Sequence, residues 1–262
     1  MKSLAEKIYL LFLRENEDSI EKVALRRRLI LSQQLDKSFD SVVRYGPLKG
    51  FKFAENTWWG EADRGPMLLG LYELEVLDSL KDIPSKYDTF INLGAADGYY
   101  GVGVLVGNLF SKSICYEINE VGRETIKENA RLNGVSEKVE IRGVANKDFY
   151  RNMDKSILDN SVLLVDIEGG EFEIVNKETF EAFRKSIIII ELHEFWCLSD
   201  GKRELEKMLN DSQSTHHITE FRSGSRDPAS FQELKKYSDT DRWLICSEGR
   251  PKVMRWWRFD PK

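Results

Sequence analysis

The segment Asp88–Val104 constrains the fold of this 262-residue chain more than any other stretch. A short apolar run, Phe90–Leu93, leads into the small-residue turn Gly94–Gly98, and a second apolar, glycine-rich run follows. A strand, a small turn and a helix start let a nucleotide-type ligand approach the backbone closely. Glu117 ends the next apolar run, roughly 20 residues after the turn, where a Rossmann-like unit binds a ribose.

Composition limits the classes of protein. Hydrophobic residues make up 41% of the chain and charged residues 32%, which is typical of a folded globular protein. A net charge of −5 gives no global attraction for nucleic acid, so we expect no nucleic-acid partner. Cys115, Cys197 and Cys246 are isolated from one another, which favours reduced thiols and a cytoplasmic location. Met1–Arg14 is too short an apolar stretch for a membrane span and lacks a cleavage pattern, so we expect no membrane partner.

The chain divides into two predicted parts. We expect residues 1–84 to form a helical and aromatic extension, serving as a lid or as the surface of a homo-oligomer, and residues 85–262 to form the ligand-binding domain. In the extension, the apolar spacing predicts the helices Lys2–Gln34 and Met67–Leu80, a hairpin around Phe51–Phe53 and a loop at Asp63–Pro66. The pair Trp58–Trp59 covers either the site or the core, and burial is the simpler interpretation.

Strands and helices alternate from Tyr87 onward. The predicted strands are 90–93, 113–116, 139–142, 161–166 and 187–192, and the predicted helices are 98–109, 120–133, 172–183 and 205–209. Continuous apolar strands between amphipathic helices indicate a mostly parallel, doubly wound α/β sheet covered on both faces. Trp243–Cys246 and Val253–Arg258 are predicted to form a terminal antiparallel strand pair.

Small or acidic residues follow four of these strands, at the edge where open parallel sheets bind ligands. They include Gly94, Glu117, Ala145 and Asp166. The turn GAADG is neither GxGxxG nor a P-loop, so it favours neither a dinucleotide nor a nucleotide triphosphate. The acids Asp97 and Glu117 favour instead a nucleoside with hydroxyl groups and a cationic centre.

Asp88–Val104 together with Glu117 resembles motif I of class I S-adenosylmethionine-dependent methyltransferases. The later stretches DIEGGE, at Asp166–Glu171, and ELH, at Glu191–His193, resemble the FkbM-type branch of that class. The resemblance implies a Rossmann-like methyltransferase fold and S-adenosyl-L-methionine as cofactor. It also implies methyl transfer to a hydroxyl of a small acceptor, such as a sugar or a secondary metabolite.

The resemblance also implies site residues. Asn92 stands where many members carry an acid, so the methionine amino group is expected to contact Asn92 or Asp97. The full expected cofactor set is Asn92, Gly94, Ala95, Ala96, Asp97, Gly98, Tyr99, Glu117, Ile118, Ala145, Asp166 and Glu168.

His193 is the best candidate for a general base, because it follows the fifth strand at the expected active-site edge. Asp166 and Glu191 are the further catalytic candidates. Asp166, Glu191 and His193 would also be the ligands of any Mg²⁺, but His is a poor ligand for that ion and we do not favour a metal. Glu171 is interpreted as an acid that stabilises the first turn of a helix.

Other interpretations stay open at this stage. The same fold could serve an NAD-linked oxidoreductase, or a non-catalytic module that binds S-adenosylmethionine or a partner. His216 and His217 are expected at the surface. Arg222, Arg226 and Arg242 are candidates for binding an anionic acceptor, although solvated charges are the simpler interpretation.

Overall fold

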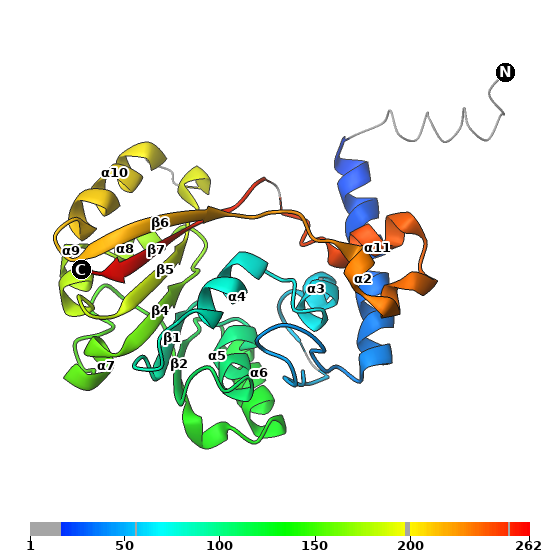
Figure 1. Ribbon diagram of the computed structural model, residues 1–262. Coiled ribbons are helices and arrows are strands. Elements are labelled where there is room, and N and C mark those ends of the chain that lie inside the picture. The colour runs from blue at the N-terminus through cyan, green and yellow to red at the C-terminus, as the bar shows by residue number, and fades with distance from the viewer. Residues whose placement is uncertain (1–16, 56, 197–199, 251) are drawn as a thin grey trace.

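The described residues, 17–55, 57–196, 200–250 and 252–262 of a computed structural model, form a seven-stranded sheet covered by helices (Figure 1). The strand order is β3-β2-β1-β4-β5-β7-β6. The strands are β1 (Thr89–Leu93), β2 (Lys112–Tyr116), β3 (Val139–Arg142), β4 (Ser161–Val165), β5 (Ile187–Glu191), β6 (His216–Arg222) and β7 (Arg255–Pro261). The first five strands run parallel, and β7 pairs antiparallel with both β5 and β6. The predicted α/β fold, with its parallel sheet and antiparallel C-terminal pair, is confirmed.

Helices lie on both faces of the sheet and beyond one edge of it (Figure 1). The helices of four or more residues are α2 (Glu17–Phe39), α3 (Arg64–Leu68), α4 (Leu74–Lys81), α5 (Tyr99–Val106), α6 (Glu120–Leu132), α7 (Lys155–Asp159), α8 (Glu171–Ile174), α9 (Lys177–Ala182), α10 (Gly201–Ser212), η5 (Gln232–Lys236) and α11 (Asp239–Cys246). The three-residue turns of 3₁₀ helix are η1 (Glu61–Asp63), η2 (Ser136–Lys138), η3 (Glu194–Trp196) and η4 (Pro228–Ser230).

Alternate side chains of the central strands feed two hydrophobic cores. In β1, Phe90 joins the core that contains α5 and the N-terminal segments, whereas Ile91 and Leu93 join the core under α8 and α9. All five residues of β1 are buried, as are all five of β4. Burial on both faces explains why these strands are continuous apolar runs rather than alternating ones.

The strand order reverses at β1, which pairs with β2 on one side and with β4 on the other. Gly94 turns the chain away at this point with φ +82°, and a Cβ there would stand 1.7 Å from the Asp166 carbonyl oxygen. Only glycine tolerates both the backbone conformation and the close approach. The turn therefore opens a crevice beyond the carboxyl ends of β1, β2 and β4.

The described part of the N-terminal extension shares a hydrophobic core with one face of the sheet. Leu31 and Leu35 of α2 belong to the same core as Phe90 of β1. At the far end of the molecule α2 lies beside α11 (Figure 1), and Arg27 makes a double hydrogen bond to Asp241. The helix predicted over Lys2–Gln34 is present from Glu17 and continues to Phe39; residues before Glu17 lie outside the described part.

Local predictions fail where the backbone takes unexpected turns. The helix expected over Met67–Leu80 is broken between α3 and α4, because Gly70 and Glu73 have positive φ. The predicted loop Asp63–Pro66 instead contains the start of α3. The predicted hairpin around Phe51–Phe53 is only an isolated bridge between Val42 and Lys52.

The C-terminal half holds three further corrections. Trp243–Cys246 is the end of α11, and the antiparallel partner of β7 is β6. Ser238 caps α11 by accepting a hydrogen bond from the Asp241 amide, a helix-start signal that the strand interpretation overlooked. The helix predicted over Phe172–Phe183 is divided into α8 and α9, with Asn176 capping the second.

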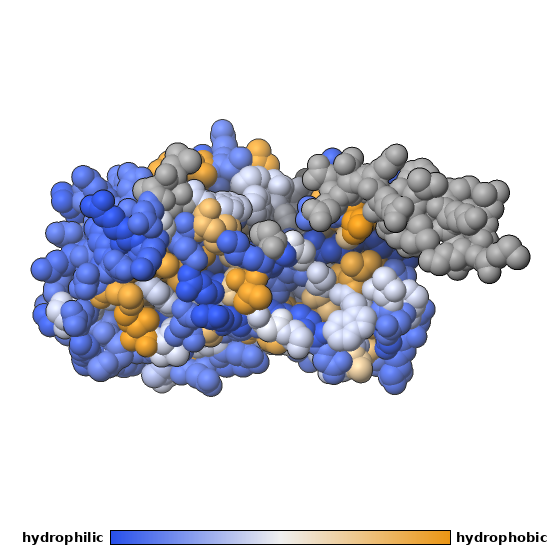
Figure 2. All heavy atoms as spheres, turned by 90° about the horizontal axis from the view of Figure 1, so that it is seen from above, coloured by the Kyte–Doolittle hydropathy of each residue, from blue (hydrophilic) through white to orange (hydrophobic). Residues whose placement is uncertain are grey.

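Among the described residues, every helix is too short or too polar to span a bilayer. The face drawn in Figure 2 is largely hydrophilic, with hydrophobic residues scattered in small groups.

Candidate active site

A cavity of about 350 Å³ opens at the reversal point of the sheet, within the size range of small-molecule sites. It is lined by residues from the ends of β1, β2, β3 and β4 together with two tryptophans of the extension. These residues are Trp58, Trp59, Gly94, Ala96, Tyr116, Glu117, Ile118, Gly143, Val144, Ala145, Asp166, Ile167, Glu168, Gly170 and Ile174.

The cavity brings together only part of the expected cofactor set. Its wall contains Gly94, Ala96, Glu117, Ile118, Ala145, Asp166 and Glu168. The remaining candidates, Asn92, Ala95, Asp97, Gly98 and Tyr99, are buried and do not line this cavity. Tyr99, for example, turns toward the extension, where its hydroxyl donates to the Met67 carbonyl and its ring stacks on Phe53.

Glu117 is held with its carboxylate at the cavity wall. One carboxylate oxygen accepts from the Ala96 amide at 2.9 Å, and the other accepts from the Asn119 amide at 2.7 Å. Each oxygen retains a lone pair for a ligand hydroxyl. Beside it, the exposed apolar side chains of Ile118 and Val144 offer a flat surface for an aromatic base. This combination fits the adenosine of S-adenosylmethionine.

Asp97 faces the protein rather than the cavity. Its carboxylate accepts hydrogen bonds from the Thr57 hydroxyl and, at 3.3 Å, from the Trp58 amide. Burial raises the pKa of Asp97, and the hydrogen bonds from Thr57 and Trp58 partly oppose that rise. The acid of the glycine turn therefore anchors the extension to the site.

His193 lies just beyond β5, buried among three carboxylates. Its Nδ1 is 3.4 Å from Glu171 Oε1, and its Nε2 is 3.4 Å from Glu168 Oε2 and 3.9 Å from Asp166 Oδ1. Burial opposes charging of the ring, but the Glu171 carboxylate beside Nδ1 and the negative charges of Asp166 and Glu168 outweigh burial and raise the pKa of His193.

Glu171 contributes more than the helix-end role predicted for it. The side chain is fully buried, and its two oxygens accept hydrogen bonds from the backbone amides of His193 at 2.8 Å and Gly169 at 2.9 Å. It thereby fixes the position of His193 and faces Nδ1. A carboxylate beside Nδ1 favours a proton on that ring nitrogen, while Nε2 faces Glu168 and Asp166.

Asp166 and Glu191 form a carboxylate pair beside His193, with ligating atoms of all three residues within 4.8 Å of one another. Burial raises the pKa of Asp166 to about 7, helped by the charge of Glu73. Burial and the charge of Asp166 likewise raise the pKa of Glu191 well above its usual range. The pair can therefore hold a proton near neutral pH.

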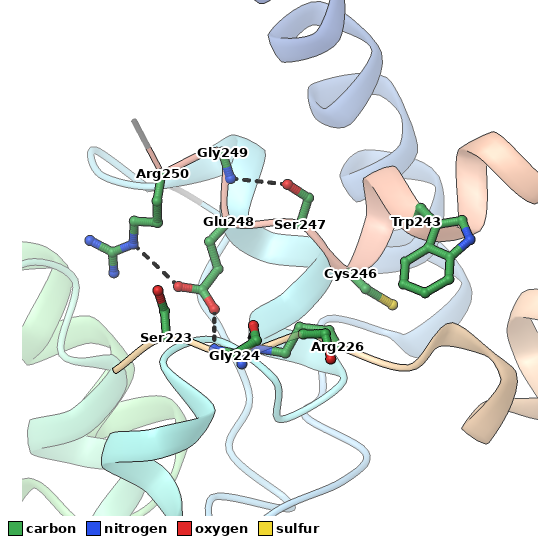
Figure 3. Close-up of a pocket in the computed structure, with 10 residues that line it drawn as sticks. Ser223, Gly224, Arg226, Trp243, Cys246, Ser247, Glu248, Gly249 and Arg250 are labelled. Atoms are coloured by element: carbon green, nitrogen blue, oxygen red, sulfur yellow. Dashed lines mark hydrogen bonds and ion pairs between the residues drawn. The ribbon is translucent and has the colours of Figure 1, made fainter. Parts of the chain in front are cut away.

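Arg250, which the sequence interpretation missed, supplies the cation of this region. Its guanidinium donates to Glu191 at 3.1 Å and to Glu248 at 3.2 Å, and it also bonds Glu73. Figure 3 shows Arg250 and Arg226 on either side of Glu248, at the edge of a second cavity of about 340 Å³. Nothing in the composition of its turn distinguishes Arg250 from a solvated arginine.

The three arginines expected near an acceptor serve structural ion pairs instead. Arg226 is buried, and it bonds both Glu75 oxygens as well as Glu248 at 2.7 to 2.8 Å. Arg222 pairs with Glu220 on the surface, and Arg242 with Asp239. These side chains do not line the ligand cavity.

Asp166, Glu191 and His193 place their ligating atoms close enough together to hold a metal ion. Glu191 Oε2 and Asp166 Oδ1 are buried without a hydrogen-bond partner in the described part of the chain, as a ligand set requires. Arg250, however, already donates to the other oxygen of Glu191 and provides the counter-charge that an ion would provide. The three side chains are therefore a poor ligand set for a divalent cation.

Two further predictions need correction. Trp58 and Trp59 line the ligand cavity, so the interpretation of this pair as core burial is wrong. His216 is buried in β6, where Nε2 lies 3.2 Å from the Ser186 carbonyl oxygen, whereas His217 is exposed as expected. Cys115 and Cys246 are buried free thiols, and Cys197 lies outside the described residues.

The solved structures to which this chain is similar include several that are named as methyltransferases. The m1A22 tRNA methyltransferase of Bacillus subtilis is 11% identical over 71% of this chain and 64% of that chain, with a TM-score of 0.45. A Streptococcus pneumoniae protein, a putative tRNA (m1A22) methyltransferase in complex with S-adenosyl-L-methionine, is 12% identical over 71% of this chain and 72% of that chain, with a TM-score of 0.45. The ribosomal protein L11 methylase of Lactobacillus delbrueckii subsp. bulgaricus is 10% identical over 81% of this chain and 85% of that chain, with a TM-score of 0.47. No curated protein sequence matches the chain.

The model of the methyltransferase FkbM domain matches residues 73–225, more than half of the chain and the whole span from β1 to β6. The matched span contains the glycine turn, Glu117 and the carboxylates around His193. The chain therefore belongs to the FkbM family of methyltransferases and is a methyltransferase that uses S-adenosyl-L-methionine.

Proposed function

We propose that this methyltransferase acts on a hydroxyl oxygen of a small acceptor, such as a sugar or a glycosylated metabolite. The observation that carries the proposal is His193, held by Glu171 on one side and facing Asp166 and Glu168 on the other. A hydroxyl is a weak nucleophile at neutral pH and gains from a nearby proton acceptor. A neutral His193 ring that carries its proton on Nδ1 would supply one at Nε2.

In this proposal the chain holds the cofactor through Glu117 and the shelf formed by Ile118, Val144 and Ala145. Bound S-adenosyl-L-methionine supplies an already activated methyl group, so the protein chiefly provides proximity and alignment. Gly94 and Gly170 let the backbone border the cavity without side chains. The acceptor would enter from the side of Asp166 and Glu168, which both line the cavity and approach His193.

His193 would accept the hydroxyl proton at Nε2 as the new carbon–oxygen bond forms. Glu171 would keep the remaining proton on Nδ1, and the carboxylates of Asp166 and Glu168 would stabilise the imidazolium. Glu191 would hold Asp166 in place together with the charge of Arg250. These roles use the catalytic candidates His193, Asp166 and Glu191 as a single group.

Two features support a glycosyl acceptor. The Trp196 side chain is 53% exposed, and its ring centroid lies 5.6 Å from that of His193. Exposed tryptophan faces stack on apolar faces of rings while their edges stay hydrated. The acids around the base, including Glu168 and Asp166, repel a polyanion, which favours a small neutral acceptor over a nucleic acid.

The decisive experiment is a methyl-transfer assay with a panel of glycosides and matched amino sugars, followed by identification of the methylated atom. We expect methyl ethers from the wild type and loss of turnover in His193→Gln with unchanged S-adenosylhomocysteine affinity. Trp196→Ala should raise KM for the acceptor and leave KM for the cofactor unchanged. Methylation only on nitrogen would reject the proposal, and cofactor binding without transfer across the panel would favour a non-catalytic module.

We also propose that the N-terminal extension mediates oligomer formation and that the protein is cytoplasmic. α2 exposes Ile20, Val23, Leu25 and Ile30, which supports a homo-oligomer formed through the N-terminal helices. Light scattering on the wild type and on Val23→Glu would test this, because a monomeric wild type contradicts it. The buried free thiols Cys115 and Cys246 support a reducing, cytoplasmic environment.

A further inference from the structure

We propose that Trp58 is a cofactor-binding residue whose indole N–H donates a hydrogen bond to a ribose oxygen, and that Asp97 positions it. The inference concerns the methyl donor alone. It holds or fails whatever the acceptor is, so an error in the proposed acceptor class leaves its test intact.

The Trp58 indole lines the cavity near Glu117, the acid proposed to bind the ribose. Its Nε1 is shielded from solvent and has no hydrogen-bond partner among the described residues, although Trp58 lines the cavity. A Cβ placed on Gly122 of α6 would stand 2.5 Å from Trp58 Nε1 and 2.8 Å from Glu117 Cγ. Glycine at position 122 therefore lets the indole nitrogen lie close to the Glu117 side chain.

An N–H buried without a partner is costly, and it is seldom kept unless a ligand or water completes it. A ribose hydroxyl is both a donor and an acceptor. The Glu117 carboxylate only accepts hydrogen bonds, and an indole N–H only donates them. The Glu117 carboxylate could therefore accept the hydrogen of a ribose hydroxyl, while the Trp58 N–H donates to the oxygen of the same hydroxyl or of the adjacent one.

Hydrogen bonds fix the backbone of the extension at this tryptophan and just before it. Asp97 accepts from the Thr57 hydroxyl and from the Trp58 amide. Asn129 of α6 donates to the Asp97 carbonyl at 2.7 Å and accepts from the Ala54 amide at 2.7 Å. Asp97 is therefore a positioning residue, which explains how an acid of the glycine turn can matter to the cofactor while lying outside the cavity.

The first test is calorimetric titration of Trp58→Phe with S-adenosylhomocysteine. Phenylalanine keeps an aromatic ring and removes only the donor, so we expect affinity to fall roughly three- to tenfold. Trp243→Phe is the matched control, because Trp243 is an exposed tryptophan of α11 that does not line this cavity, and it should bind within about twofold of wild type. Equal affinity of Trp58→Phe and wild type would overturn the proposal.

Analogues lacking the 2′ or the 3′ hydroxyl separate hydrogen bonding from ring packing. If the indole donates to one of these oxygens, the penalty of Trp58→Phe should vanish with the analogue that lacks that oxygen. An undiminished penalty with both analogues would overturn the ribose assignment.

Asp97→Ala tests the positioning role through the same ligand. It should raise KM for S-adenosylmethionine several-fold and leave kcat nearly unchanged, since it does not touch the acceptor side. A loss confined to kcat would contradict the role assigned to Asp97. Melting temperatures without ligand identify any variant whose weak binding reflects loss of the fold.

Discussion

Replacing Arg250 tests whether one guanidinium balances the buried acids next to the base. The side chain is mostly buried and bonds Glu73, Glu191 and Glu248 from three different parts of the chain. Arg250→Met keeps much of the volume but leaves these carboxylates without their cation. Removing one partner of a buried charge pair costs about 3–5 kcal/mol. For a chain of this size that corresponds to a melting temperature lower by roughly 6 to 20 °C.

The stability lost in Arg250→Met should increase as pH rises. Burial already raises the pKa of Glu191 and of Glu248, and the charge of Arg250 opposes both shifts. Without Arg250 the folded-state pKa values rise further above the unfolded values. Such groups contribute stability below the unfolded pKa and lose it as pH rises through the folded pKa. The stability lost on substitution should therefore grow between about pH 5 and pH 8.

Thermal or urea unfolding across this pH range provides the measurement. Arg222→Met is the matched control, because it removes an exposed ion pair with Glu220 and should change stability by no more than about 0.5 kcal/mol. A stability deficit of the Arg250 variant that equals the control, or one that shrinks toward pH 8, would refute the charge-balance reasoning.

Three other predictions follow from the site. Turnover should rise with pH through the His193 pKa, which Glu171 and the nearby acids raise above 6.5, and His193→Gln should lose this limb of the pH–rate profile. Gly94→Ala should lower the melting temperature and abolish S-adenosylhomocysteine binding, because its Cβ would meet the Asp166 carbonyl. Gly134→Ala, where φ is also positive but nothing lies within 4 Å, should cost only about 1 kcal/mol. Treatment with EDTA should leave methyl transfer unchanged because Arg250 already neutralises Glu191, and activity restored only by Mg²⁺ would contradict this.

The parallel part of the sheet was predictable because its strands are buried on both faces. Ser161–Val165 and Ile187–Glu191 are continuous apolar runs, and no other arrangement hides them. β6 was missed for the opposite reason: His216–Arg222 is a polar edge strand, mostly accessible, and its pairing is dictated by β7 rather than by its own pattern. Short apolar runs such as Trp243–Cys246 fit a helix and a strand equally well, so only the Ser238 cap could have decided between them.

The candidate site was predictable to the extent that it follows strand ends. Glu117, Asp166 and His193 each come directly after a strand or within two residues of it, so the topology alone gathers them. The partners of these residues could not be predicted in the same way. Arg250 and Trp58 come from distant loops, and a single sequence carries no signal that either contacts an acid of the site.

The acids of the two sequence motifs differ in function because they differ in what they face. Glu117, which follows β2, lines the cavity and keeps lone pairs available for a ligand. Asp97, in the turn after β1, instead accepts hydrogen bonds from the Thr57 hydroxyl and the Trp58 amide. Glu171 also accepts one backbone amide on each oxygen, but it is fully buried, does not line the cavity and faces His193. A motif thus fixes where a carboxylate lies along the chain, and the groups that the carboxylate faces decide whether it binds the ligand or positions the group that does.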